Sequence, residues 1–67
     1  MEHTNFIASE YKKVGFEAKA LTGNCIKISL KNRKPSKQEV EFATEQIFDG
    51  EIFFRLISSY DGILAIV

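Results

Sequence analysis

The sequence has few of the residues that usually stabilise very small domains or carry catalysis. Its 67 residues include one cysteine, one proline, one histidine and no tryptophan. Because Cys25 has no second cysteine to pair with, an internal disulfide framework is excluded, and we expect a reducing, cytoplasmic location. The fold must then be stabilised by a hydrophobic core or by self-association.

Long apolar runs and an excess of one charge are also missing. The longest apolar runs, residues 52–54 and 63–67, are far shorter than the roughly 20 residues that span a bilayer. The N-terminus lacks the basic and apolar segments of a secretion signal, so we expect no membrane contact. Nine basic and nine acidic residues cancel, which excludes a chain that binds nucleic acid by overall positive charge.

What the sequence does contain is enough apolar material for a core. The apolar fraction is 45%, and six phenylalanines and two tyrosines supply bulky side chains. This composition is typical of globular proteins, so residues 1–67 are expected to form a single small domain. A chain of this size buries only about 60% of its unfolded surface, so each large apolar side chain matters.

The first residues predict a short helix. Thr4 or Asn5 can cap a helix that runs to Val14, and Gly15 then ends it. Spacings of three and four residues place three apolar side chains on one stripe of this helix. They are Ile7, Tyr11 and Val14.

Alternating residues then predict a β-hairpin, with strands at 16–21 and 25–30. A two-residue turn would set the apolar residues of one strand against the polar residues of the other. A three-residue loop, 22–24, avoids this and leaves Asn24 in the left-handed conformation that asparagine tolerates. The pairs then formed are Ala20 with Ile26, Ala18 with Ile28 and Phe16 with Leu30. The opposite, solvent-facing side carries Glu17, Lys19, Leu21, Cys25, Lys27 and Ser29.

The second predicted helix begins after the polar loop at residues 32–35. Ser36 and Glu39 have the spacing of a capping box, in which each side chain binds the backbone N–H of the other residue. One apolar stripe follows, and Asp49-Gly50 ends the helix. The stripe consists of Val40, Ala43, Thr44, Ile47 and Phe48.

A second hairpin completes the chain, with strands at 51–57 and 63–67 and a turn signal at Asp61-Gly62. The sum is an α+β fold in the order α-β-β-α-β-β, with a four-stranded, mainly antiparallel sheet and two helices. Both faces of this last hairpin are apolar. One carries Ile52, Phe54 and Leu56; the other carries Phe53, Ile57, Leu64 and Ile66, interrupted by Arg55.

Groups that could catalyse a reaction or hold a cofactor are scarce. His3 and Cys25, the only histidine and the only cysteine, could form a base and nucleophile pair, but no third orienting group accompanies them. The sequence contains no Cys-x-x-Cys or paired-histidine motif for a metal, and its four glycines stand at predicted element ends rather than in a phosphate-binding loop. We therefore predict that the protein is not an enzyme and uses no cofactor or metal.

Charge is segregated along the chain although the total is zero. Residues 18–38 contain six basic residues and no acid, whereas residues 39–51 contain five acids and no base. The basic segment is a candidate surface for phosphates or for an acidic protein, with solubility as the alternative explanation. Its residues are Lys19, Lys27, Lys31, Arg33, Lys34 and Lys37. A pairing of Lys37 with Glu41 would offset part of this segregation.

Two apolar features are candidate partner-binding sites. Phe42 falls opposite the apolar stripe of the second helix, where it is either exposed or covered by another segment. The second is the outer face of the last hairpin. Either the two helices lie on opposite faces of the sheet and one of them covers it, or another chain covers it. The residues of that face are Phe53, Arg55, Ile57, Leu64 and Ile66. A homodimer or a protein partner is the favoured interpretation.

About half of the chain resembles part of a known protein family. The residues concerned are Ala43-Thr-Glu45-Gln46-Ile-Phe48-Asp-Gly50, Arg55-Leu56 and Gly62-Ile-Leu64-Ala65. They resemble the helix and hairpin of small phage-encoded anti-CRISPR proteins that inhibit type I-F complexes. The resemblance implies binding to a Cas protein surface that obstructs target DNA, without catalysis. The chain departs from that family, which has basic residues around its helix, because the helix here is acidic after Lys37. Only residues 31–37 could play the corresponding part, and no contact residue is carried over.

The expected function is a non-enzymatic inhibitor or adaptor that docks on a larger protein or ribonucleoprotein complex. Two alternatives stay open. The first is a small nucleic-acid-binding module, whose binding would weaken steeply with salt. The second is a homodimeric structural subunit, which the oligomeric state in solution would reveal.

Overall fold

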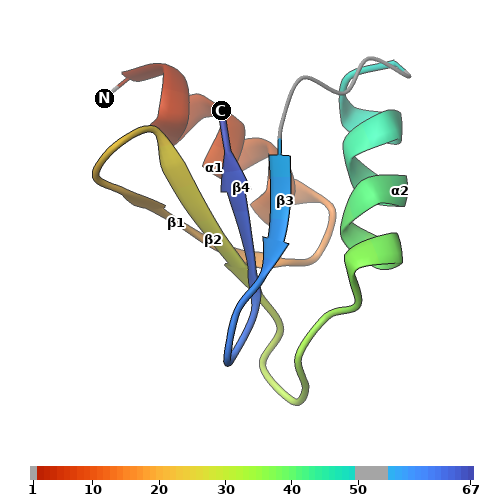
Figure 1. Cartoon of the computed structure of the whole chain (residues 1–67). Coiled ribbons are helices and arrows are strands. Elements are labelled where there is room, and N and C mark those ends of the chain that lie inside the picture. Colours follow the sequence, from red (N-terminus) through yellow and green to blue (C-terminus); the bar gives the residue numbers. More distant parts are fainter. Residues whose placement is uncertain (1, 50–54) are drawn as a thin grey trace.

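A computed structural model of the chain describes residues 2–49 and 55–67 and has its elements in the predicted order (Figure 1). The elements are α1 (Glu2–Lys13), β1 (Glu17–Leu21), β2 (Cys25–Ser29), α2 (Lys37–Ile47), β3 (Arg55–Ser58) and β4 (Ile63–Ile66). The α+β class with two helices and a four-stranded sheet is confirmed. Residues 51–54, the first part of the strand predicted at 51–57, lie outside the described residues.

The sheet has the strand order β1-β2-β4-β3, and every neighbouring pair is antiparallel. The predicted register of the first hairpin is confirmed at Ala20–Ile26 and Ala18–Ile28. The third predicted pair, Phe16 with Leu30, lies just beyond the ends of β1 and β2 and is not part of the ladder. Asn24 in the connecting loop has a φ of 56°, as the three-residue loop requires. The last strand of the domain, β4, lies between β2 and β3, an arrangement that alternation within each strand does not specify.

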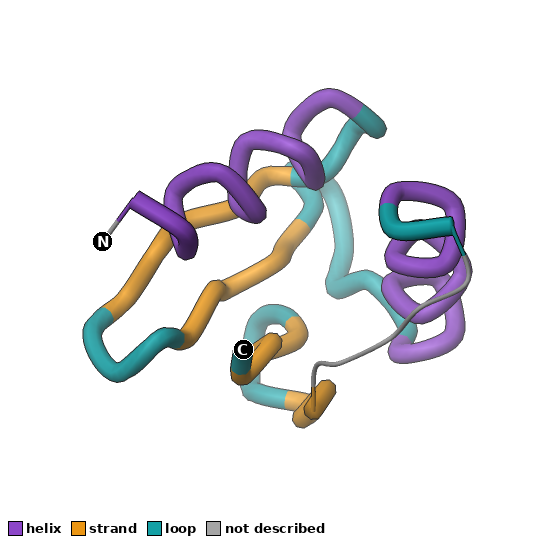
Figure 2. Tube along the Cα trace, turned by 90° about the horizontal axis from the view of Figure 1, so that it is seen from above, coloured by secondary structure: helices purple, strands orange, loops and turns teal. Residues whose placement is uncertain are grey.

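Both helices lie on the same side of the sheet (Figure 2). Helix α1 packs over β1 and β2, and α2 packs beside β3 and against α1. One side of every strand contributes to a single core beneath the helices. Its buried strand residues are Ala18, Ile26, Ile28, Leu56, Ile63 and Ala65. The alternative in which the helices cover opposite faces is therefore wrong.

Helix α1 differs from its prediction at both ends. It begins at Glu2, so Thr4 is not its cap; Thr4 lies inside the helix, is 2% exposed and faces the core. The helix ends at Lys13, and Val14, predicted to be in the apolar stripe, is 46% exposed. The buried stripe of α1 consists of residues 4, 7, 8 and 11, so Thr4 belongs to the helix itself. Val14 follows the last helical turn and is therefore not part of the stripe.

Helix α2 begins as the capping box predicts. The Glu39 N–H donates to the Ser36 hydroxyl at 3.1 Å, and the Ser36 N–H donates to the Glu39 carboxylate at 2.9 Å. Further along, Thr44 donates to the Val40 carbonyl at 2.6 Å and is hydrogen-bonded to the buried hydroxyl of Tyr11. Thr44 has only one hydroxyl proton, so Tyr11 is the donor in the second bond, which connects the two helices.

The β3–β4 hairpin turns through residues 59–62, where the Ser59 N–H donates to the Gly62 carbonyl at 2.9 Å. Gly62 does not have a positive φ, so a left-handed Asp-Gly turn does not explain the glycine. A Cβ atom at this position would overlap the backbone carbonyl oxygen of Ile28 in β2. Glycine is required here because the turn approaches β2 closely.

Candidate protein-binding surface

The side of the sheet opposite the helices has no described helix on it, and we call it the open face (Figure 2). Strand pairing arranges its side chains in two rows across all four strands, beside a shorter row of Glu17 and Ser29 on β1 and β2. The first row, from β1 to β3, is Lys19, Lys27, Leu64 and Ile57. The second row is Leu21, Cys25, Ile66 and Arg55.

These rows place the apolar residues in one diagonal strip with cations on both sides. The strip runs from Leu21 on β1 to Ile57 on β3, and its exposed members are 37–40% accessible. Cys25 and Leu64 between them are half-buried. Lys19 and Lys27 occupy one corner and Arg55 the diagonally opposite corner. The open face is therefore apolar along its middle. It is positive at Arg55 and of mixed charge at the opposite end, where Glu17 shares the face with Lys19 and Asp61 pairs with Lys27.

The structure brings together four of the predicted partner-binding residues and separates a fifth. Arg55, Ile57, Leu64 and Ile66 all lie on the open face, as their alternation indicated. Phe42 is 63% exposed but belongs to α2, on the other side of the sheet. Phe53 lies outside the described residues. The apolar candidates therefore form two separate surfaces rather than one.

Sequence reasoning missed two members of the apolar strip, Leu21 and Cys25. The sequence predicts both on the solvent-facing side of the first hairpin, because lysines and a glutamate alternate with them. Cys25 pairs with Ile66 of β4, which joins that side to the outer side of the second hairpin. The sequence does show that these two apolar residues lie on a face predicted to be solvent-exposed. Only the β2–β4 pairing shows that they continue the apolar surface of the second hairpin.

Two of the predicted basic residues converge on the β3–β4 turn. Lys27 donates from Nζ to Asp61 Oδ2 at 2.6 Å, and Lys34 donates from Nζ to Ser58 Oγ at 2.6 Å. The hydrogen bond from Lys27 lowers the pKa of Asp61, and the charge on Lys34 adds a smaller effect in the same direction. Asp61 thus offsets much of the positive charge at this end of the sheet.

Arg33 is engaged within the fold. Its guanidinium makes two hydrogen bonds of 2.6 Å to the Glu39 carboxylate, the same carboxylate that completes the capping box. The hydrogen bonds from Arg33, followed by that from the Ser36 backbone, lower the pKa of Glu39 from 4.5 to about 2. Arg33 fixes the loop before α2 to the first turn of that helix, and a nucleic acid would have to displace Glu39 to use it.

Lys19, Lys31 and Lys37 have no ion pair or hydrogen bond from their side chains within residues 2–49 and 55–67. They lie apart, with Lys19 on β1, Lys31 after β2 and Lys37 at the start of α2. The expected pairing of Lys37 with Glu41 is not formed among the described residues. The six predicted cations are therefore not one continuous surface.

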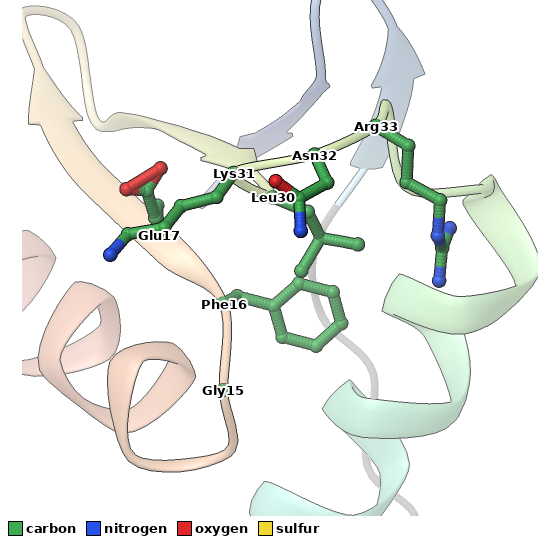
Figure 3. A pocket seen from close by; sticks show the side chains of 7 residues that line it. All are labelled: Gly15, Phe16, Glu17, Leu30, Lys31, Asn32 and Arg33. Atoms are coloured by element: carbon green, nitrogen blue, oxygen red, sulfur yellow. The ribbon is translucent and has the colours of Figure 1, made fainter.

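An open cavity of about 450 Å³ lies where the loop before β1 meets the loop after β2 (Figure 3). The side chains of Phe16 and Leu30 point toward α2, whereas Lys31 and Glu17 point away from it (Figure 3). Arg33 also lines the cavity but is bound to Glu39. The cavity combines an apolar floor with one unpaired lysine, and its lining residues do not form a set of converging reactive groups.

Within the described part of the chain, no group of three or more histidine, cysteine, aspartate or glutamate residues could hold a metal ion. Neither described helix is long and apolar enough to cross a membrane. Comparisons with protein-family models, with curated proteins and with solved structures find no match to this chain.

Proposed function

We propose that this chain is a non-enzymatic protein-binding module, an inhibitor or adaptor that docks on a larger protein through its open face. The observation that carries the proposal is the apolar strip from Leu21 to Ile57, left uncovered because both helices lie on the other side of the sheet. A contiguous exposed apolar patch on a small domain marks an interaction site, since leaving it in water is unfavourable.

The charges beside the strip indicate the chemistry of the partner. Lys19 and Arg55 stand at opposite corners and have no ion pair from a described residue. A partner that presents carboxylates around an apolar centre would pair these cations as it covers the strip. A homodimer formed through the same strip stays an alternative, which the oligomeric state in solution would reveal.

Nucleic-acid binding is less well supported by the same geometry. Lys27 and Arg33 are already paired with Asp61 and Glu39, and the unpaired lysines are spread over separate elements. An anti-CRISPR role stays a prediction that rests on the resemblance in residues 43–65. It would use the open face to dock on a Cas complex and block target DNA.

The test compares one substitution on the open face with a matched substitution elsewhere. Ile66→Glu places a carboxylate in the strip, whereas Val14→Glu makes a similar change at the end of α1; the two residues are 37% and 46% exposed. Ile57 is replaced by a photo-crosslinking phenylalanine analogue, and the protein is irradiated in a lysate of its source organism. The cross-linked protein is identified by mass spectrometry, purified and titrated against each variant.

We expect Ile66→Glu to weaken the affinity for this partner at least about tenfold, as loss of a central interface residue does. Val14→Glu should bind like the wild type. A partner that binds both variants equally would overturn the proposal, as would failure to cross-link any protein from position 57. A duplex DNA probe that binds and then dissociates steeply with added salt would replace it with nucleic-acid binding.

A further inference from the structure

Another open cavity, of about 340 Å³, lies where the first turn of α1 meets the end of β1 and the loop after it. Thr4 belongs to the buried stripe of α1, which faces the sheet, and Ala20 lies on the helix side of β1, where it pairs with Ile26. The small side chain of Ala20 leaves space beneath Thr4 at this end of the helix–sheet interface. All the lining residues are uncharged: Thr4, Asn5, Ala20, Leu21, Thr22 and Gly23.

The hydroxyl of Thr4 has no hydrogen-bond partner although the residue is only 2% exposed. It is the one buried side-chain nitrogen or oxygen in residues 2–49 and 55–67 of which this is true. The other buried threonine, Thr44, bonds both the Val40 carbonyl and the Tyr11 hydroxyl. Buried polar groups nearly always have a partner, because an unpaired one is unfavourable. Since Thr4 lines the cavity, a group inside the cavity is the partner that it can acquire.

The chemistry of that partner follows from the end of the helix. Helix α1 has 12 residues and begins at Glu2, so the backbone N–H groups of His3 and Thr4 have no acceptor within it. No described side chain accepts from them, whereas the first turn of α2 is bonded by its capping box. Free N–H groups and the positive end of the helix dipole favour an anion. This end of the cavity therefore favours a negatively charged acceptor.

We infer that the cavity binds a small oxyanion, a phosphate or carboxylate group, which accepts a hydrogen bond from the Thr4 hydroxyl. The first-turn N–H groups of α1 stabilise its charge, and Asn5 and Thr22 in the lining carry further donors. No lysine or arginine lines the cavity, so we expect a weak site with a Kd on the order of millimolar. The site shares only Leu21 with the open face and is a second site, separate from the proposed function.

The test removes the hydroxyl and keeps the shape of the side chain. Thr4→Val does this, and Thr4→Ser is the matched control that retains the donor. Each protein is titrated with inorganic phosphate, and separately with acetate, up to about 50 mM at constant pH and ionic strength. The backbone amide signals are followed by NMR. Urea unfolding of the same proteins is measured with and without phosphate.

We expect phosphate or acetate to shift the amide signals of residues 3–5 and 22–23 saturably in the wild type and in Thr4→Ser. Thr4→Val should bind at least about tenfold more weakly, because it lacks a hydrogen bond to a charged group. Without the anion, Thr4→Val should have a higher urea midpoint than the wild type, since no unpaired hydroxyl is buried. The bound anion should raise the midpoint of the wild type and leave that of Thr4→Val unchanged.

Three results would overturn the inference. The first is an absence of saturable shifts at residues 3–5 with both anions. The second is a Thr4→Val variant that binds as the wild type does. The third is a Thr4→Val variant that is unfolded or less stable than the wild type, because the hydroxyl would then have a partner within the folded chain. Saturation by one anion alone supports the site and assigns it to phosphate or to carboxylate. The proposed function is tested separately, at Ile66.

Discussion

The two sides of strand β4 have similar residues and different surroundings. Ile63 and Ala65 point toward the helices and are 1% and 0% exposed. Leu64 and Ile66 point to the open face, where Ile66 is 37% exposed. Hydrophobicity does not distinguish these sides; the position of the helices does. The covered side stabilises the chain, and the open side is the surface that we propose binds a partner.

The largest expected effect separates the two sides by one substitution on each. Ile63→Ala should lower the free energy of unfolding by about 2–5 kcal/mol, because it removes buried methyl groups and leaves a cavity. Ile66→Ala should cost less than about 1 kcal/mol, since its side chain is partly in water already. Urea unfolding of both variants measures the difference.

Equal losses at the two positions would break the comparison, because they would mean that the open side is also part of the core. If Ile63→Ala does not fold, Ile63→Val provides the same test with an expected cost of about 0.5–1.5 kcal/mol. Ile66→Val is then the matched change on the open side, with an expected cost close to zero.

A smaller effect tests the polar contact inside the covered layer. Thr44→Val leaves the buried Tyr11 hydroxyl without its acceptor, which should cost about 1–3 kcal/mol of unfolding free energy. Tyr11→Phe should cost about 1 kcal/mol or less, because Thr44 keeps its own bond to the Val40 carbonyl. The double variant completes a thermodynamic cycle, and a coupling energy of zero would contradict the contact.

The smallest effect concerns the exposed pairing of Arg33 with Glu39. The pKa of Glu39 is lower in the folded chain than its ordinary value of 4.5, so this carboxylate stabilises the fold above pH 4.5. That contribution is lost as pH falls from 4.5 to about 2. The stability advantage of the wild type over Glu39→Gln should therefore shrink across this range in urea unfolding. Arg33→Gln should flatten the same difference, and an advantage that does not vary with pH would contradict the assignment.

Local features of the fold could be predicted from the sequence. Ser36 and Glu39 marked the start of α2, because a capping box involves only residues three apart. The register of the first hairpin followed from matching its apolar residues across a short loop. The α-β-β-α-β-β order needed nothing more than such local patterns.

Features that depend on distant contacts could not be predicted in the same way. The central place of β4 depends on the close approach of Gly62 to Ile28, which two isolated hairpin patterns do not reveal. The open face was anticipated at Ile57, but its extension to Leu21 required the β2–β4 pairing. Arg33 appeared available for a partner because its bond to Glu39 requires the loop before α2 to fold back.

The central place of β4 also determines when the domain can form during translation. Cys25 and Ile66 are cross-strand partners although most of the chain separates them. Until β4 has left the ribosome, β3 has no neighbour in the sheet, and β2 has a partner on one side only. Pairings this distant in sequence are slow to form. Until β4 is synthesised, one edge of β2 therefore stays unpaired in the nascent chain, and an unpaired strand edge is prone to aggregation.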